Sequence, residues 1–177
     1  MNCYSEVVSL VDRAEIAFAG RNYQNALDTY TSAVKIVREL ERSRLVAVLL
    51  NRMGYVLQAQ GKIQDAVITY ESALHALEKD TTLNLESVVN RLGQVGKGYS
   101  ISDPEPLPDL YSATVAQTLE ADENDPTLAS KILLNIGNAY LQQPQAEPAL
   151  NAYEQALQRP EIDTNPLLRA YAIANIG

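Results

Sequence analysis

The sequence predicts an all-α protein that is built as a stack of antiparallel helix pairs. Three segments, which begin at Ala14, Gly54 and Gly137, align with one another without gaps, and each has an alanine 12 positions after its small first residue. A tyrosine and a second alanine follow four and seven positions later, which places the three side chains on one helical face. These positions are Ala26, Tyr30 and Ala33; Ala66, Tyr70 and Ala73; and Ala149, Tyr153 and Ala156. No segment has the pattern of a β-strand.

Each of the three segments contains chain-breaking residues where a hairpin turn is expected. The breakers are Gly20 to Asn22, Gly61 and Pro144. Small residues on two facing helices let the backbones approach each other, while a tyrosine between them fills the neighbouring space. The pattern therefore predicts two closely packed antiparallel helices in each repeat.

Caps and prolines set the expected helix boundaries. Asp125 before Pro126, and Asn165 before Pro166, are typical of an N-cap that is followed by a first-turn proline. Combined with the repeat pattern, these signals predict nine helices. They are expected near 4–19, 23–41, 43–60, 63–79, 83–97, 107–121, 126–142, 147–158 and 166–177.

With this pattern, the sequence resembles the tetratricopeptide repeat family, whose two-helix unit carries the same small, aromatic, small signature. The resemblance covers residues 8–40, 47–79 and 130–160. The period is 40 residues, as between positions 14 and 54, which is longer than the family's usual 34 and resembles the kinesin-light-chain variant. The resemblance implies a right-handed superhelical solenoid whose first helices line a concave groove.

We expect residues 1–177 to form a single array of about 4.5 repeats. The third repeat is degenerate, because Asp109 takes the place of the first alanine and the proline-rich loop 101–109 enlarges its turn. The chain ends within a predicted first helix, which is either part of a longer array or a terminal cap; because terminal repeats need a polar outer face and this segment is apolar, we expect a fragment of a longer array. The expected units are repeats 4–41, 43–79, 83–121 and 126–160 and the half-repeat 166–177.

The groove that the resemblance implies would be lined by residues beside the marker glycines of the first helices. These positions form a ladder of amides with three cations: Asn51, Arg52, Asn90, Arg91, Gln94, Lys131, Asn135, Asn138 and Asn175. An asparagine amide can pair with a peptide backbone N–H and C=O, and arginines favour an acidic side chain or a terminal carboxylate. The alternative is that these asparagines bond to neighbouring helices or face solvent.

One partner type known for the family is not expected. The family's clamp for the carboxyl-terminal tail of heat-shock chaperones resembles a set of lysine, asparagine and arginine on consecutive first helices. In the first repeat the matching positions hold Val11 and Glu15. An acidic residue there would repel a carboxylate.

Composition and charge exclude several other function classes. The formal net charge of -8 and the pI near 4.6 argue against nucleic acid or an anionic membrane as the partner. No apolar run approaches the roughly 20 residues that cross a bilayer, so no membrane insertion is expected. The single histidine, His75, lies on a predicted second helix, and we expect no catalytic residues, no metal site and no cofactor. The acidic run 122–125 lacks the glycine of a calcium loop and is expected to be a solvated linker with a helix cap.

The sequence therefore predicts a non-enzymatic protein interaction module, a scaffold or adaptor that binds a partner protein or peptide in the groove. A cytoplasmic location is expected, because the start of the chain lacks a signal peptide and Cys3 is the single cysteine. Two alternatives stay open. The array would otherwise be the regulatory domain of a larger enzyme or signalling protein, such as a caspase-like protease, or a self-association module that forms a homo-oligomer through the half-repeat 166–177.

Overall fold

The computed structural model describes residues 3–78 and 109–177, and the secondary structure of this part of the chain consists of helices joined by short turns. Its eight α-helices and one short 3-10 helix confirm the prediction of an all-α fold. They are α1 (Cys3–Ala19), α2 (Tyr23–Glu39), α3 (Ser43–Ala59), α4 (Ile63–Glu78), α6 (Asp109–Asn124), α7 (Leu128–Gln142), α8 (Ala146–Gln158), η1 (Pro160–Thr164) and α9 (Pro166–Ile176). None of the helices in these two ranges has the length and apolar character that crossing a membrane requires.

Most of the expected helix boundaries are confirmed to within two residues. The expected helix 83–97 lies outside the described residues. The end of α6 differs most, because this helix continues to Asn124 rather than stopping near residue 121. The prediction that the acidic run 122–125 forms a solvated linker is therefore wrong: its first three residues are helical, and Glu123 is only 9% exposed.

The two predicted N-caps have different outcomes. Asn165 is confirmed, since its side-chain oxygen accepts a hydrogen bond from the Leu168 backbone N–H at 3.1 Å. The cap at Asp125 is wrong, because α7 begins at Leu128. Asp125 instead accepts hydrogen bonds from the backbone N–H of Thr127 at 2.8 Å and from its hydroxyl at 2.7 Å, and these close the turn between α6 and α7.

The turn inside the first helix pair shows why the chain reverses there. Two bonds close the end of α1, from the Asn22 N–H to the Ala17 carbonyl at 2.8 Å and from the Arg21 N–H to the Phe18 carbonyl at 2.9 Å. This motif needs a residue with positive φ, which is Arg21 at φ 58 here and Gly61 at φ 80 in the second pair. Both turns lie where the breakers predicted them.

The interior of each pair is a close contact between a small residue and a tyrosine. A Cβ added at Gly54 would lie 2.4 Å from the ring of Tyr70, and one added at Gly137 would lie 2.5 Å from the ring of Tyr153. Tyr30, Tyr70 and Tyr153 are at most 1% exposed. The predicted role of the small and aromatic positions is therefore confirmed: the missing side chain makes room for the ring of the facing helix.

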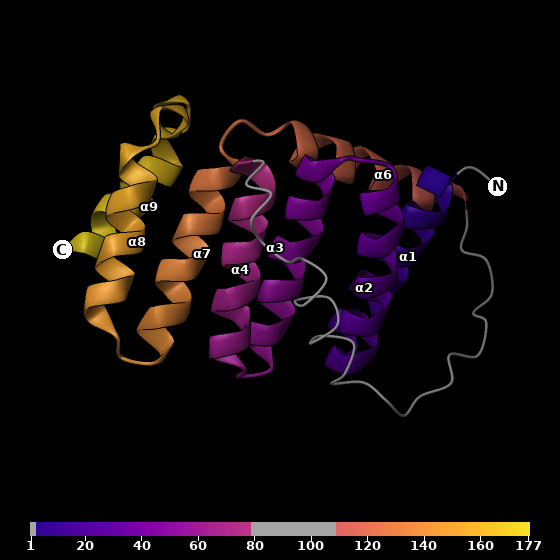
Figure 1. Ribbon diagram of the computed structural model, residues 1–177, viewed down its shortest axis with the longest axis horizontal. Helices are drawn as coiled ribbons and strands as arrows, with labels where there is room; N and C mark the ends of the chain where they lie inside the picture. The colour runs from indigo at the N-terminus through magenta and orange to yellow at the C-terminus, as the bar shows by residue number, and fades with distance from the viewer. Residues whose placement is uncertain (1–2, 79–108) are drawn as a thin grey trace.

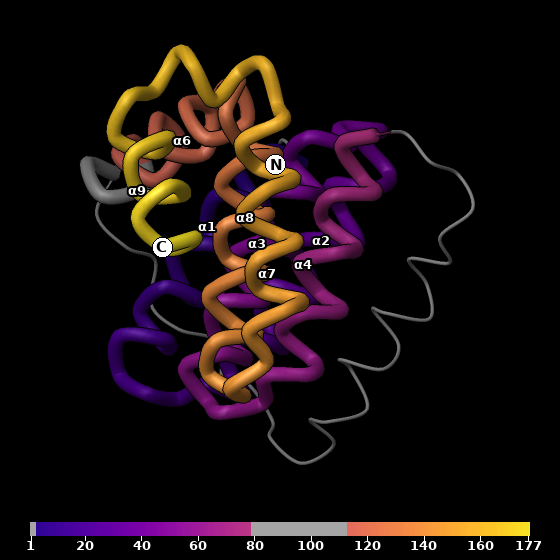
Figure 2. Tube along the Cα trace, turned by 90° about the vertical axis from the view of Figure 1, so that its left-hand side faces the viewer, coloured from indigo at the N-terminus to yellow at the C-terminus, as the bar shows by residue number. Residues whose placement is uncertain are grey.

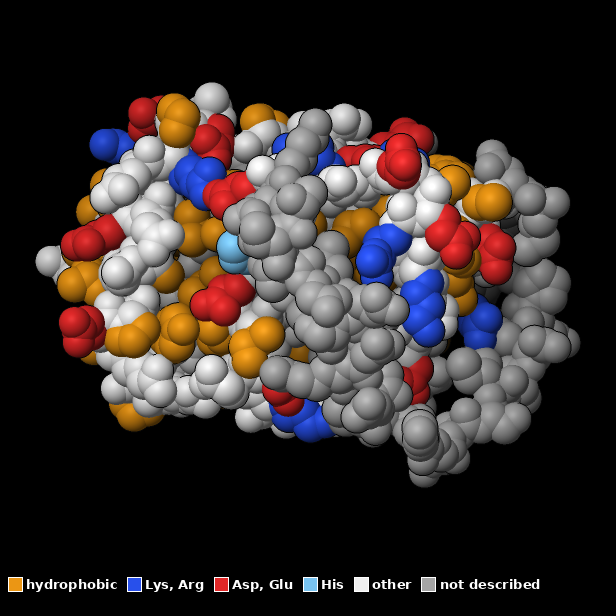
Figure 3. Space-filling model, viewed as in Figure 1, with side chains coloured by type: hydrophobic (Ala, Val, Ile, Leu, Met, Phe, Trp, Pro, Cys, Tyr) orange, Lys and Arg blue, Asp and Glu red, His pale blue; other side chains and the backbone are white. Residues whose placement is uncertain are grey.

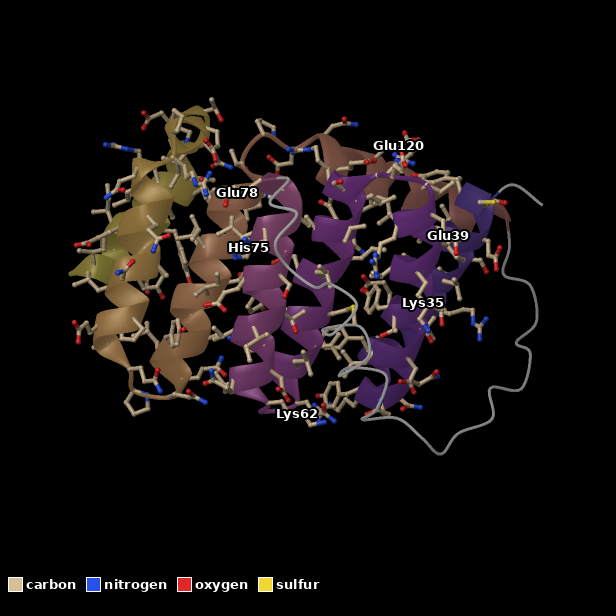
Figure 4. The ribbon with its side chains drawn as sticks, viewed as in Figure 1. Lys35, Glu39, Lys62, His75, Glu78 and Glu120 are labelled. Carbon is tan, nitrogen blue, oxygen red and sulfur yellow. The ribbon has the colours of Figure 1, made fainter. Side chains whose placement is uncertain are left out.

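The order in which the helix pairs stack differs from the order of the expected repeats along the chain. α2 packs against α3, α4 packs against α7, and α8 packs against α9. Arg159, which follows α8, forms an ion pair with Glu78, at the upper end of α4 in Figure 4. This ion pair joins the pair α3 and α4 to the pair α7 and α8. The pair α7 and α8 thus lies directly on the pair α3 and α4. The expected second helix of the degenerate repeat is α6, and it packs against α1 and α3 instead.

The stack has two broad faces. In Figure 2, α1, α6 and α9 lie on one side, and α2 and α4 lie on the other. We call the side formed by α1, α3, α7 and α9 the first-helix face. Figure 1 shows α6 running crosswise to the paired helices at their upper ends. Figure 3 shows the opposite, second-helix face, where charged side chains of both signs lie among hydrophobic ones and His75 reaches the surface.

Candidate functional site

A recess of about 150 Å³ opens on the first-helix face, and four helices contribute to its walls. It is bounded by Glu15 and Phe18 of α1, Tyr30 of α2, Asn51, Arg52, Tyr55 and Val56 of α3, and Asn135 of α7. Three of these residues, Asn51, Arg52 and Asn135, belong to the ladder that the sequence predicts. The direct stacking of α7 on the second pair is what brings residues 51 and 135 together.

Two ladder asparagines form a pair at the edge of the recess. The side-chain N–H of Asn135 donates to the side-chain oxygen of Asn51 at 2.9 Å, and both residues are half-buried. This bond uses one donor and one acceptor, so the amide N–H group of Asn51 and the amide oxygen of Asn135 have no hydrogen bond to another described residue. The pair therefore offers a donor and an acceptor side by side, which is the complement of one peptide unit.

Arg52 lies between two carboxylates. Its guanidinium donates to Glu15 Oε1 at 2.5 Å and to Asp122 Oδ2 at 2.7 Å, and its side chain is 19% exposed. Burial alone would lower the pKa of Arg52, but the hydrogen bond that it donates to Asp122 and the nearby negative charges raise this pKa above its usual value. Arg52 thus stays charged, and that charge is already balanced within the protein.

The carboxylate of Glu15 also holds the buried tyrosine of the first pair. The hydroxyl of Tyr30 donates to Glu15 Oε1 at 2.5 Å. Burial and then the negative charge of Glu15 raise the pKa of Tyr30 far above its ordinary value of 10.0, so this hydroxyl remains a donor. We call the chain of contacts through Tyr30, Glu15, Arg52 and Asp122 the charge network.

Aromatic side chains form the other rim of the recess. Tyr55 is 57% exposed, and its ring meets the ring of Phe18 edge to face, with 5.9 Å between the centroids. Phe18 also contacts Tyr23 at 6.0 Å, and Ile16 on the same helix is 48% exposed. Exposed aromatic side chains next to open hydrogen-bonding groups are typical of protein interfaces.

The other predicted ladder residues lie away from the recess and have partners of their own. Lys131, in the first turn of α7, pairs with Asp125 in the turn before this helix. Asn138 accepts hydrogen bonds from the hydroxyls of Tyr153 at 2.8 Å and Tyr171 at 2.9 Å. The side-chain N–H of Asn175 donates to the Tyr171 carbonyl at 2.8 Å, within α9. The remaining three, Asn90, Arg91 and Gln94, lie outside the described residues.

Sequence reasoning missed several residues of the site. Glu15 and Tyr55 each follow a marker residue by one position, as Asn138 does, so the same phase predicts that they face the recess. The predicted ladder contains amides and cations alone, so it includes neither residue. The partnership of Arg52 with Asp122 has no signal in the sequence, since the two residues are 70 positions apart.

A larger hollow of about 410 Å³ lies on the second-helix face, between α4, α7 and α8. Its apolar floor includes Leu74 and Ile136, and Glu71 and Glu147 flank it. Burial raises the pKa of Glu71 above its ordinary value. None of the ladder residues that the structure describes lines this hollow, so it provides a distinct surface against which the recess can be tested.

Comparison with protein families connects the repeats to a known group. One tetratricopeptide repeat profile matches residues 6–79, which include most of α1 and all of α2, α3 and α4, and a second one matches residues 130–162, which include most of α7 and all of α8. Both matches leave out α6. No catalytic domain is detected. Neither curated proteins nor solved structures gave a match.

Proposed function

Because this chain belongs to the tetratricopeptide repeat family, whose domains generally mediate protein interactions, we propose that it holds a peptide segment of a partner on its first-helix face. The observation that carries the proposal is the asparagine pair at the recess. Asn51 and Asn135 come from stacked first helices and together present a donor and an acceptor that are unused among the described residues. Such a pair binds a peptide backbone whatever its sequence.

The size and lining of the recess indicate what else the partner contributes. A cavity of about 150 Å³ holds a group the size of benzene, so one apolar or aromatic partner side chain would fill it. Phe18 and Tyr55 would contact that side chain, since both line the recess and Tyr55 is more than half exposed. Aromatic anchors in such pockets contribute most of the binding energy in many interfaces.

The cations of the ladder do not by themselves provide a preference for acidic partners. Arg52 and Lys131 are each paired with carboxylates of the protein. Their charges therefore favour an acidic partner only if those carboxylates are displaced. The backbone clamp and the apolar recess, rather than net positive charge, support binding here, and the ladder residues Asn90, Arg91 and Gln94 extend the same proposal beyond the described residues.

A displayed random-peptide library, selected on the whole chain, tests this function. We expect enriched peptides whose affinity falls at least about tenfold in the double variant Asn51→Ala/Asn135→Ala, because two hydrogen bonds are lost. Asn151→Ala is the matched control, since Asn151 lines the hollow on the second-helix face. Enrichment of no peptide, or peptides that bind the double variant as well as the unchanged protein, would contradict the proposal.

Self-association is a second candidate, and the surface of α9 favours it. Leu167 is 84% exposed, Tyr171 46% and Ile173 48%. Exposed apolar side chains on one short helix are typical of a surface that another chain covers. Sedimentation over a hundredfold concentration range should give a mass above the monomer that returns to the monomer in Leu167→Asp/Ile173→Asp. A strict monomer at every concentration would exclude this candidate.

A further inference from the structure

Helix α6 lies on the first-helix face without being part of the stack. It packs against α1 and α3, while the neighbouring pairs contact each other directly through α4 and α7. Figure 2 places α6 on the same side as α1 and α9. One side of α6 faces the protein: Leu119 is fully buried, and Val115 and Ala116 are partly buried against the core. Gln117 and Thr118, on its other side, are exposed. The stack thus does not need α6 to connect its parts.

Three arginines of the second pair's first helix and its N-terminal turn hold the end of α6. Arg52 bonds to Asp122, and Arg42 forms an ion pair with Glu123 whose second bond measures 3.1 Å. Arg44 donates to the backbone carbonyl of Glu123 at 2.6 Å and to that of Asp125 at 2.7 Å. These contacts satisfy both the acidic side chains and the carbonyls at the negative end of the helix.

The surface under α6 therefore has a defined chemistry. An apolar part of this surface contacts a leucine. Guanidinium groups beside it donate hydrogen bonds to two carboxylates, which lie three and four positions after that leucine on the helix. Charge-assisted bonds of this kind are short and directional, so they select for acidic residues at those positions. Any helix with the same leucine and acidic spacing meets the same set of groups.

We propose that α6 is an internal occupant of the partner-binding face, and that a partner helix with a leucine followed three and four positions later by two acidic residues displaces it and takes its place. The inference rests on the proposed function, because Arg52 both holds α6 and lines the recess. Displacement of Asp122 removes one of the two carboxylates that balance Arg52. The recess and the α6 surface then form one continuous binding site for an acidic partner.

Tethering sets the size of the expected effect. A segment on the same chain competes at an effective concentration in the millimolar range, so a free helix of equal affinity binds the unchanged protein weakly. The apparent dissociation constant equals the intrinsic one divided by the fraction of molecules whose site is open. Variants that weaken α6 in the chain should therefore raise the affinity for a helix that is added in solution. The size of that gain measures how strongly α6 competes for this surface.

The test uses a fluorescent peptide with the sequence of residues 109–125, titrated with the whole chain. In the release variant Leu119→Ala/Asp122→Asn, we expect the peptide to bind at least about tenfold more tightly than in the unchanged protein. Glu120→Gln is the matched control: Glu120 lies on the same helix at the upper edge of the molecule (Figure 4), is exposed, and forms no ion pair with the other described residues. It should leave the affinity unchanged.

Further variants keep the result decisive. Adding Arg42→Ala/Arg52→Met to the release variant should remove the gain, because the receiving groups are lost. If Leu119→Ala/Asp122→Asn unfolds by circular dichroism, Asp122→Asn/Glu123→Gln, which keeps the size of each side chain, replaces it. A folded release variant that binds the peptide no more tightly than the unchanged protein overturns the inference.

The peptides selected from the library separate this inference from the proposed function. If they bind the unchanged protein, depend on Asn51 and Asn135, and are indifferent to the release variant, the proposed function stands and the inference is wrong. If no library peptide binds while the 109–125 peptide binds the release variant, α6 is displaceable and the proposed backbone clamp is wrong.

Discussion

The first and third described helix pairs bury equivalent tyrosines, but the hydroxyl groups of these tyrosines have different hydrogen-bond acceptors. In the first pair, Tyr30 donates its hydroxyl hydrogen to the carboxylate of Glu15 at 2.5 Å. In the third described pair, Tyr153 donates to the amide oxygen of Asn138 at 2.8 Å. Glu15 and Asn138 are equivalent, since each follows the small marker residue of its first helix by one position. The interior of the repeat is thus the same, but one acceptor is charged and the other is neutral.

The acceptor decides which neighbour the face receives. Glu15 also pairs with Arg52, whose guanidinium binds Asp122 of the crossing helix α6. Asn138 instead accepts a second hydroxyl, that of Tyr171 on the next helix of the stack. We call α1 and α3, where the acceptor at this position is the carboxylate of Glu15, the charged half, and α7 and α9, where the acceptor is the amide of Asn138, the neutral half. The repeat pattern determines the packing inside each pair, and the residue one position after the marker determines which neighbouring side chain each part of the first-helix face contacts.

The largest effect is expected from Arg52→Met in the charged half. The substitution leaves the carboxylates of Glu15 and Asp122 without their shared cation. Breaking a fully buried pair costs about 3–5 kcal/mol, but these carboxylates are partly exposed, so we expect a loss of about 2–3 kcal/mol in the free energy of unfolding. Urea denaturation measures it.

Asn138→Ala in the neutral half provides the comparison for that experiment. It removes an acceptor from two hydroxyls but strands no charge, so the expected loss is about 1 kcal/mol. Equal losses for the two variants would break the distinction between a charged and a neutral half.

The interior of the pairs was predictable from the sequence, because it depends on local spacing. The offsets of four and seven place Ala66, Tyr70 and Ala73 on one helical face, and the glycine at position 54 meets that face across a short turn. The turns were predictable for the same reason, since Gly20 and Gly61 lower the local helix propensity and Gly61 readily adopts the positive φ that the turn requires. Such features need no knowledge of distant residues.

The position of α6 was not predictable in this way. Its helix was expected, but the contacts that place it join residues 70 to 81 positions apart. The repeat pattern predicts the degenerate repeat 83–121 between the second pair and α7, whereas the surfaces of α4 and α7 pack directly. Helix phase gave the face on which Asn51, Arg52 and Asn135 lie. It carried no information on which neighbour each side chain meets.

A second prediction tests whether the interior is as uniform as the comparison requires. Gly54→Ala and Gly137→Ala each place a methyl group within 2.5 Å of a buried tyrosine ring, so the helices must shift. Overpacking of this kind costs about 1–3 kcal/mol, and we expect about 2 kcal/mol for each variant by urea denaturation. Gly20→Ala is the control, since its added Cβ would lie 3.4 Å from the nearest atom. Losses that differ widely between positions 54 and 137 would contradict a shared interior.

A third prediction concerns Asp12, a fully buried residue of the charged half whose two carboxylate oxygens form no hydrogen bond in the described structure. Burial, and then the charge of Glu15, raise the pKa of Asp12 above its ordinary value of 3.8. Its contribution to stability is therefore fully present below pH 3.8 and is lost as the pH rises through the folded-state pKa. We expect Asp12→Asn to stabilise the protein by about 1 kcal/mol at pH 7 and the gain to vanish at low pH.

Asp125, in the turn between α6 and α7, supplies the control of opposite sign. Burial alone would raise the pKa of Asp125, but its bonds to Lys131 and Thr127 lower it below the ordinary value of 3.8. Its stabilisation is present above pH 3.8 and is lost as the pH falls through the folded-state pKa. Asp125→Asn should therefore destabilise the protein at pH 7 and match it in acid. Parallel stability curves for the two variants between pH 3 and 7 would refute both assignments.

The smallest effect sharpens the comparison from the neutral half. Arg169 of α9 pairs with Asp163 at 3.1 Å, but the two side chains are 54% and 72% exposed. Water and salt screen such a pair, so Arg169→Ala should cost less than about 0.5 kcal/mol, and the difference should disappear in 1 M salt. Arg169 and Arg52 have the same chemistry, and Arg52 lies against a covering helix. If urea denaturation gave similar losses in the free energy of unfolding for the two variants, the covering helix α6 would not explain the larger contribution of Arg52 to stability.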